Sequence, residues 1–128
     1  MNRDKRVFIS FAVPEDAKYR NALKAQARKE NSPFDFIDMS VKEPWSSDWK
    51  NKCRTKIKGC DGVIVLVSSA TRHASGVKHE IKCAIEEGIP VRGMYISGTQ
   101  TYPIPTELSG KRTVYWNWSN LKNFIASL

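Results

Sequence analysis

The chain has 128 residues and a formal net charge of +8 at pH 7, and 41% of its residues are hydrophobic. This length suits one domain with a hydrophobic core, so we expect a single domain over residues 1–128. The apolar runs are much shorter than the about 20 residues that span a bilayer, and residues 1–10 lack the apolar stretch of a signal peptide. We therefore expect a cytoplasmic protein without a membrane partner.

The basic residues are spread along the chain and do not form one block. Their main groups lie at residues 18–29, 50–58, 78–82 and 111–112. A positive net charge attracts polyanions and acidic protein surfaces, but it does not determine a fold. Most of these groups fall on predicted helices, so we interpret them as solvated helix faces, and nucleic-acid binding is the less favoured alternative.

The three cysteines, Cys53, Cys60 and Cys83, have neither CxxC spacing nor the spacing of a metal site. All three fall on predicted helices or at helix ends. We interpret them as reduced, partly buried thiols rather than as a redox or zinc site, so no metal is expected.

Strand-like segments alternate with helical ones from the start of the chain. RVFISF at 6–11 is a β-branched and aromatic run, and Pro14, followed by two acids, suits the first turn of a helix. That helix ends at an Asn-Ser-Pro break. FDFIDM at 34–39 predicts a second strand, and the loop after it leads to a helix capped by Ser46 or Ser47.

The most apolar segment lies in the middle of the chain. GVIVLV at 62–67 has no alternation, as in a strand buried on both faces of a parallel sheet. A helix over about 76–87 follows, and Gly88 suits its end. Residues 97–112 lack a periodic signal and are long for a connector, which leaves open whether they form an ordered loop or a lid. The remaining predicted strands lie at 91–96 and 113–116, and the last helix at about 118–127.

This alternation predicts an α/β domain in three layers, with a parallel sheet and helices on both faces. With five strands and the most apolar one third, we expect the flavodoxin-like order 2-1-3-4-5. Ligands of such sheets bind beyond the carboxyl ends of the strands, where the strand order reverses. The loops that begin at Ser10 and at Ser68 are therefore the ones expected to carry function.

Several common functions of this architecture lack their residues here. A phospho-receiver needs an aspartate at the end of the third strand, which instead reads Val67-Ser68-Ser69. A flavin phosphate needs a loop rich in hydroxyl groups and glycine after the first strand, where the sequence reads FAVPE. Neither GxxxxGK[ST] nor GxGxxG occurs in the chain. These patterns argue against a receiver, a flavodoxin and both common nucleotide-binding loops.

Glu80 is the acid that its neighbours explain least. The expected core stripe of its helix is Val77, Ile81, Ala84, Ile85 and Gly88. At about 100° per residue, Glu80 lies on the flank of this stripe, where its stem would be partly buried. The positions three and four residues on are Cys83 and Ala84, so no helical ion pair accounts for the charge. Glu80 is therefore either a first-turn acid that the helix dipole favours or a carboxylate that faces a ligand.

Four segments together resemble a known family. KRVFISFAVPED resembles the first strand and loop of TIR and TIR-like domains, and FIDMS followed by a tryptophan resembles their second strand and BB loop. GCDGVIVLVSSATRHASGV and HEIKCAIEEGIPV resemble the central strand with its serine-rich loop and the helix with the family's catalytic glutamate. The closest pattern is the TIR-like domain of bacterial Thoeris anti-phage systems, the ThsB type. Many TIR domains carry S-x-W-C-x-x-E before this helix, whereas here Ser75 precedes Glu80 by five positions.

The resemblance implies cleavage of NAD between nicotinamide and ribose, often with closure to a cyclic ADP-ribose isomer that activates a partner effector. NAD is then a substrate, and no cofactor is implied. Glu80 would be the catalytic carboxylate. Residues that could line the substrate site are Ser10, Phe11, Asp38, Ser40, Ser69, Arg72 and Ser75. Three of these have simpler interpretations: Arg72 as a solvated arginine, Ser75 as a helix cap and Ser69 as a turn residue.

The alternative is a TIR-like interaction module without turnover. It would assemble through its helices and through the BB loop, residues Ser40 to Trp45, where Lys42, Glu43 and Trp45 suit a protein contact. Both roles can coexist. In TIR enzymes a neighbouring subunit often completes the pocket, which predicts weak activity in a dilute monomer.

Overall fold

The structure is a computed structural model that describes residues 5–30, 34–39 and 42–128. One parallel sheet runs through it, with the strand order β2-β1-β3-β4-β5. The strands are Lys5–Ser10 (β1), Phe34–Ile37 (β2), Gly62–Val67 (β3), Val91–Tyr95 (β4) and Thr113–Val114 (β5). The predicted α/β class and strand order are confirmed.

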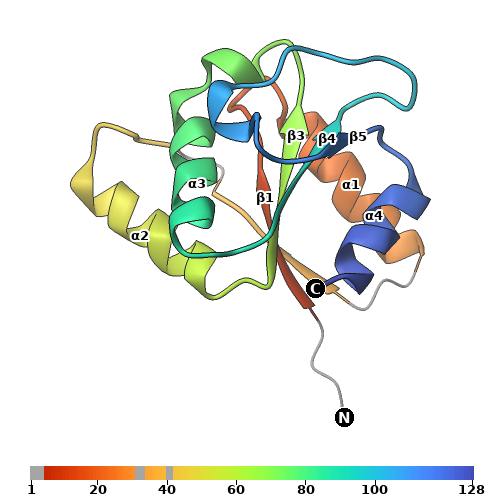
Figure 1. The fold of residues 1–128 in the computed structure, drawn as a ribbon, viewed down its shortest axis with the longest axis horizontal. Helices are drawn as coiled ribbons and strands as arrows, with labels where there is room; N and C mark the ends of the chain where they lie inside the picture. Colours follow the sequence, from red (N-terminus) through yellow and green to blue (C-terminus); the bar gives the residue numbers. More distant parts are fainter. Residues whose placement is uncertain (1–4, 31–33, 40–41) are drawn as a thin grey trace.

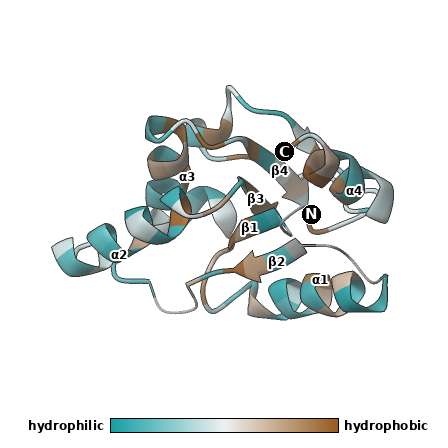
Figure 2. Cartoon of the chain, turned by 90° about the horizontal axis from the view of Figure 1, so that it is seen from below, coloured by the Kyte–Doolittle hydropathy of each residue, from teal (hydrophilic) through white to brown (hydrophobic). Residues whose placement is uncertain are grey.

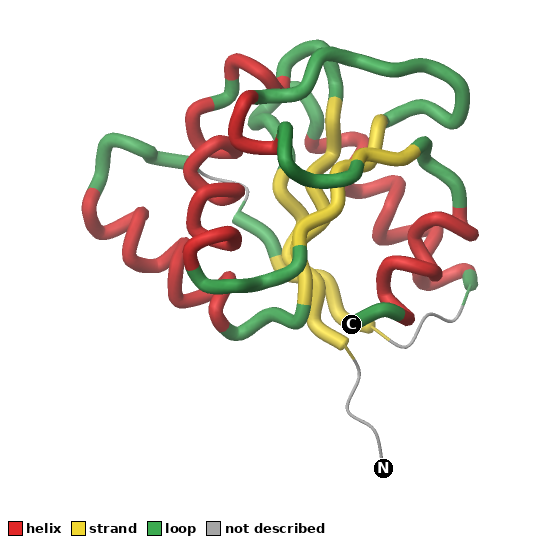
Figure 3. The backbone as a smooth tube through the Cα atoms, in the orientation of Figure 1, coloured by secondary structure: helices red, strands yellow, loops and turns green. Residues whose placement is uncertain are grey.

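Helices cover both faces of this sheet (Figures 1 and 3). The α-helices are Ala17–Lys29 (α1), Ser47–Lys58 (α2), Ser75–Glu86 (α3) and Trp118–Ala126 (α4), and two short 3₁₀ helices are Thr71–His73 (η1) and Thr106–Leu108 (η2). The pair α2 and α3 lies on one face, and the pair α1 and α4 lies on the other. Within the described ranges, no helix is long and apolar enough to cross a membrane.

The sheet divides the hydrophobic core into two layers. Alternate residues of β3 point to opposite faces, so Val65 packs with α2 and α3 while Ile64 packs with α1 and α4. β1 is divided in the same way, with Phe8 on the first face and Ile9 on the second. Figure 2 shows the apolar strands between more polar helices. All six residues of β3 are buried, as the unbroken apolar run predicts.

Two predicted boundaries differ from the structure at the site end of the sheet. The first helix begins at Ala17 and not at Pro14, because Pro14 lies in a turn in which the Asp16 N–H donates to the Ala12 carbonyl at 2.9 Å. Ser75 is the first residue of α3 and not its cap, since the N-cap is Ala74, which makes no side-chain hydrogen bond. Ser46 does cap α2 and accepts a 3.2 Å bond from the Trp49 N–H.

The long segment 97–112 packs on the side of α2 and α3. It contains η2, whose Leu108 is buried in that core layer. Tyr102 and Ile104 are partly buried against the same layer. The segment is therefore anchored by apolar contacts, which favours the ordered-loop interpretation.

Gly88 ends α3 through a left-handed backbone conformation with φ of +70°. The Ile89 N–H donates to the Ala84 carbonyl at 2.9 Å and the Gly88 N–H to the Ile85 carbonyl at 3.1 Å, so the last helical carbonyls are satisfied. This is the pattern of a Schellman cap. A side chain at this position would strain the backbone, because L-residues disfavour positive φ.

We expect Gly88→Ala to lower the free energy of unfolding by about 1–2 kcal/mol, the cost of a left-handed L-residue. Chemical denaturation followed by circular dichroism measures it. Gly110→Ala is the matched control, since a Cβ at either glycine meets open space and only Gly88 has positive φ. Equal stability of the two variants would contradict this explanation of the cap.

Candidate functional site

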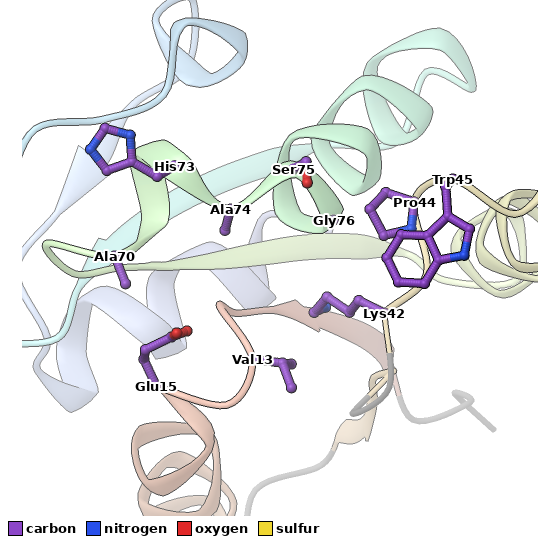
Figure 4. Close-up of a pocket in the computed structure, with 10 residues that line it drawn as sticks. All are labelled: Val13, Glu15, Lys42, Pro44, Trp45, Ala70, His73, Ala74, Ser75 and Gly76. Carbon is purple, nitrogen blue, oxygen red and sulfur yellow. The ribbon is translucent and has the colours of Figure 1, made fainter.

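A cleft of about 370 Å³ opens beside the carboxyl ends of β1 and β3. Its walls come from the β1–α1 loop, the segment before α2 and the stretch from the end of β3 to the start of α3 (Figure 4). The ten lining residues are Val13, Glu15, Lys42, Pro44, Trp45, Ala70, His73, Ala74, Ser75 and Gly76. This is the edge of the sheet at which the strand order predicts ligand binding. None of the ten comes from segment 97–112, so that segment is not a lid over this cleft.

Glu80 lies more deeply than the sequence predicts. Its exposed fraction is 0%, whereas Ile85, which we expected in the core stripe, is 43% exposed. The buried face of α3 is therefore rotated toward Glu80 and Cys83. The reason is that α3 packs on the sheet and also on α2, so two neighbours cover it. The expectation of a partly buried flank position is wrong.

Two groups distant in sequence hold the Glu80 carboxylate. The Ser10 hydroxyl donates to Oε1 at 2.7 Å, and the Lys42 ammonium donates to Oε1 at 2.8 Å and to Oε2 at 2.7 Å. Burial raises the pKa of Glu80, and the charge and hydrogen bonds of Lys42 and the bond from Ser10 act against this rise. The cation that pairs with Glu80 is therefore Lys42, which comes from the loop after β2 and not from α3.

Lys42 separates Glu80 from the cleft. Its side chain is only 7% exposed and lines the cleft, and Glu80 is not among the lining residues. Figure 4 shows the Lys42 side chain between Val13 and Gly76. A Cβ on Gly76 would lie 2.7 Å from Lys42 Cδ, so the absence of a side chain there makes room for the lysine stem. In this structure Lys42 therefore covers the Glu80 carboxylate on the side of the cleft.

Phe11 and Asp38, both predicted substrate residues, each lie next to basic side chains. Phe11 is fully buried, and Lys42 Nζ and Arg20 Cζ each lie 4.9 Å from its ring centroid. Asp38 forms ion pairs with Arg20 at 2.8 Å and with Lys24 at 3.0 Å. Burial would raise the pKa of Asp38, but the hydrogen bonds and charges of Lys24 and Arg20 outweigh it and lower the pKa. Asp38 is therefore held by α1.

The loop after β3 is fixed by a small polar network that sequence analysis did not identify. The Ser68 hydroxyl donates to the Asp16 carboxylate at the start of α1, and the Thr71 hydroxyl donates to the Leu66 carbonyl at 3.0 Å. Thr71 also accepts from the Ser68 N–H at 2.8 Å. Burial raises the pKa of Asp16, with the Ser68 hydrogen bond acting against it. This network sets the position of η1 and of the loop that leads into α3.

The remaining predicted site residues are distributed unevenly around the cleft. Ser75 lines it and is exposed. Ser69 and Arg72 are exposed on the loop and on η1 and do not line the described cleft. Ser40 lies outside the described residues. Sequence analysis missed Lys42 as a site residue; the signal for it was Glu80 itself, because a buried carboxylate needs a cation nearby.

The flavodoxin-like sheet order and the carboxylate at the β1–β3 edge fit a TIR-like α/β protein, the class that the sequence resembles. A family described as Thoeris protein ThsB, TIR-like domain, matches residues 8–101. The chain therefore belongs to the ThsB TIR-like domain family, and this family places it in the context of Thoeris anti-phage defence. No curated protein matches the sequence significantly.

Solved structures agree on the fold. The TIR domain of the Toll-related receptor TRR-2 from Hydra magnipapillata aligns with a TM-score of 0.69 and 15% identity, over 94% of this chain and 97% of that one. The IL-17 receptor B SEFIR domain aligns with a TM-score of 0.62 and 10% identity, over 99% of this chain and 96% of that one. A 3-dehydroquinate dehydratase-like protein from Bifidobacterium longum aligns with a TM-score of 0.50 and 10% identity, over 96% of this chain and 94% of that one. At these identities the likeness concerns the fold alone.

We expect Lys42→Met to destabilise the protein by about 3–5 kcal/mol, because it leaves a buried carboxylate without its cation. The double variant Lys42→Met/Glu80→Gln should lose less than the sum of the two single changes, with a coupling of about 1–3 kcal/mol. Urea denaturation of the four proteins measures this cycle.

Glu86→Gln is the control for a surface ion pair. Glu86 bonds to Arg54 at 2.6 Å in a partly exposed position, where water screens the charges, so its change in stability should be far smaller. Additive effects of the Lys42 and Glu80 changes would show that the buried pair is not coupled.

Proposed function

We propose that this chain cleaves the bond between nicotinamide and ribose in NAD, with Glu80 as the catalytic carboxylate. The observation that carries the proposal is a fully buried carboxylate at the carboxyl ends of β1 and β3, beside a cleft, in a chain of the ThsB TIR-like family. The product would be ADP-ribose or a cyclic isomer that acts as a signal for an effector protein. Self-association through the BB loop is part of the same proposal.

Cleavage of this bond requires stabilisation of positive charge and does not require acid catalysis. Nicotinamide in NAD is already cationic, so it leaves with the electron pair of the broken C–N bond and needs no added proton. Positive charge then develops on the ribose as an oxocarbenium ion. A carboxylate fixed by the Ser10 hydroxyl, in a site of low dielectric, stabilises this charge more than it stabilises the ground state. Water or a hydroxyl of the same molecule then forms a C–O bond to the ribose carbon and releases its proton to the solvent.

In this proposal, the ribose of NAD can contact Glu80 only after the Lys42 ammonium has moved away from the Glu80 carboxylate. The ammonium occupies both carboxylate oxygens, and its stem closes the side of the cleft nearest to them. While the pair is intact, Lys42 also offsets much of the carboxylate's charge, which would weaken its effect on an oxocarbenium ion. Displacement of Lys42 is therefore the conformational step that this proposal requires.

An interaction module is the second candidate, and Trp45 is the observation that favours it. Its side chain is 77% exposed at the rim of the cleft, in the segment before α2. Exposed tryptophans often anchor protein interfaces. In this case the Lys42–Glu80 pair is a structural element of the fold and the carboxylate never meets a substrate.

Nicotinamide release at high protein concentration, followed by chromatography and mass spectrometry, tests the first candidate. We expect Glu80→Gln to reduce it by about 100-fold or more, since the variant loses the charge that stabilises the transition state. The matched control is Glu86→Gln, an exposed glutamate of the same helix, which should keep the wild-type rate. Circular dichroism confirms that each variant is folded.

The outcomes separate the two candidates. Loss of turnover in Glu80→Gln alone supports the enzyme and its carboxylate. No release by the wild type, combined with self-association that Trp45→Ala abolishes in analytical ultracentrifugation, supports the interaction module. Equal rates in the wild type and Glu80→Gln would show that another residue is responsible.

The displacement of Lys42 has its own test in Gly76→Ala. The added methyl group would occupy space now filled by the lysine stem, so we expect Lys42 to be displaced and nicotinamide release to rise. Adding Glu80→Gln should abolish the gain, and Gly110→Ala should leave the rate unchanged. A folded Gly76→Ala protein with a lower rate would show that turnover needs Lys42 in its present position.

A further inference from the structure

Two cysteines and a histidine meet between α2 and α3, on the side of α3 that packs against α2. One possible ligand atom from each of Cys53, His79 and Cys83 lies within 4.8 Å of the other two. The Cys83 sulfur and His79 Nε2 are 3.2 Å apart. His79 and Cys83 are four residues apart on α3, so they share one helix face, and Cys53 faces them from α2. None of the three lines the cleft.

We propose that Cys53, His79 and Cys83 form a binding site for one thiophilic d¹⁰ cation, Zn²⁺ or Cu⁺. Thiolate and imidazole are the ligands that both ions prefer. The site revises our expectation that the cysteines have no role with metals. That expectation followed from the sequence spacing, which could not show that Cys53 lies beside α3.

The distances suit a metal after small side-chain rotations. Bonds of about 2.3 Å to sulfur and about 2.0 Å to nitrogen place tetrahedral ligand atoms roughly 3.5–3.8 Å apart. From a spacing of at most 4.8 Å, closure requires movements of about an ångström. Three protein ligands leave a fourth position for water on Zn²⁺, and they complete a trigonal site for Cu⁺.

The surroundings favour the metal-binding form of His79 but oppose that of the two cysteines. The formal charges of two thiolates and one Zn²⁺ ion cancel, whereas two thiolates and one Cu⁺ ion leave a net negative charge. Burial first, and then the charges of Lys50, Arg54 and Lys82, lower the pKa of His79, which favours the neutral imidazole that binds metals. Burial raises the pKa of both Cys53 and Cys83, with Lys42 acting against the rise at Cys53 and Arg54 at Cys83, so the metal must displace two thiol protons when it binds. Both cysteines are fully buried, so the sulfur atoms are shielded from solvent.

The packing around the cluster fixes its ligands. The Trp49 ring lies 5.5 Å from the His79 ring and limits its orientation. One turn farther along α3, Arg54 joins α2 to Glu86 and Glu87 at 2.6 Å each. His79 is therefore half-buried between two helices. A bound metal would link α2 to α3 and would hold the helix that carries Glu80, whatever reaction that residue serves.

Cys60 provides an internal comparison. It is also buried, but it lies just beyond the end of α2, its thiol donates to the Lys56 carbonyl in the last turn of α2 at 3.3 Å, and it is not part of the cluster. A buried cysteine of this kind acts as a small apolar side chain. Cys60→Ser is therefore the control for any loss of binding caused by removal of a thiol alone.

The test uses the reduced, metal-free full chain titrated with Co²⁺ as a spectroscopic substitute for Zn²⁺. We expect one Co²⁺ per chain, a thiolate-to-cobalt charge-transfer band in the near ultraviolet, and displacement of Co²⁺ by Zn²⁺. A separate titration with Cu⁺ against a chromogenic chelator determines which of the two ions binds more tightly. Bound metal should also raise the melting temperature, because it binds the folded chain.

The variants decide whether the assigned residues are the ligands. Cys53→Ser and Cys83→Ser should lose the charge-transfer band, and His79→Gln should weaken binding at least tenfold, while Cys60→Ser should bind like the wild type. His79→Gln changes a half-buried residue, so it remains informative if a cysteine variant fails to fold. The proposal is overturned if the wild type retains neither Zn²⁺ nor Cu⁺, if His79→Gln binds like the wild type, or if Cys60→Ser loses binding.

Discussion

A buried negative charge is the constraint around which this end of the molecule is arranged. Glu80 is fully buried on α3, and its carboxylate is held by Ser10 at the end of β1 and by Lys42 from the loop after β2. An isolated carboxylate in such a place is strongly unfavourable. The fold must therefore bring three separate segments to one point, and Gly76 must lack a side chain for the lysine to fit. The same arrangement that stabilises the charge also keeps it out of the cleft.

The two sides of α3 explain why its sequence is unusual. One side presents Glu80 to Ser10 and Lys42, and the neighbouring side presents His79 and Cys83 to α2. Little of this helix is left for ordinary surface residues, and its C-terminal acids Glu86 and Glu87 bond to Arg54 of α2. α3 is thus linked by polar contacts to β1, to the loop after β2 and to α2. A change in any of these elements bears on the position of Glu80.

Local patterns predicted the architecture well because each strand and helix is encoded by its own residues. The unbroken run GVIVLV identified the central strand, and Gly88 identified the end of α3. The site was harder to predict because its geometry depends on residues far apart in sequence. A helical wheel centred on the stripe of Val77, Ile81, Ala84, Ile85 and Gly88 gave Glu80 a flank position, since it could not include the second neighbour, α2. Lys42 is 38 residues from Glu80, and Cys53 meets Cys83 only through helix packing.

The edges of the sheet determine how copies of this protein can meet. β2 has four residues and β5 has two, so each edge offers few unpaired backbone groups to another strand. Growth of the sheet from one copy into the next is therefore disfavoured. Assembly is left to side chains on loops and helices, of which Trp45 at the cleft rim is the most exposed large apolar one in the described chain. Contacts of this kind are generally reversible, and a single substitution can change their strength.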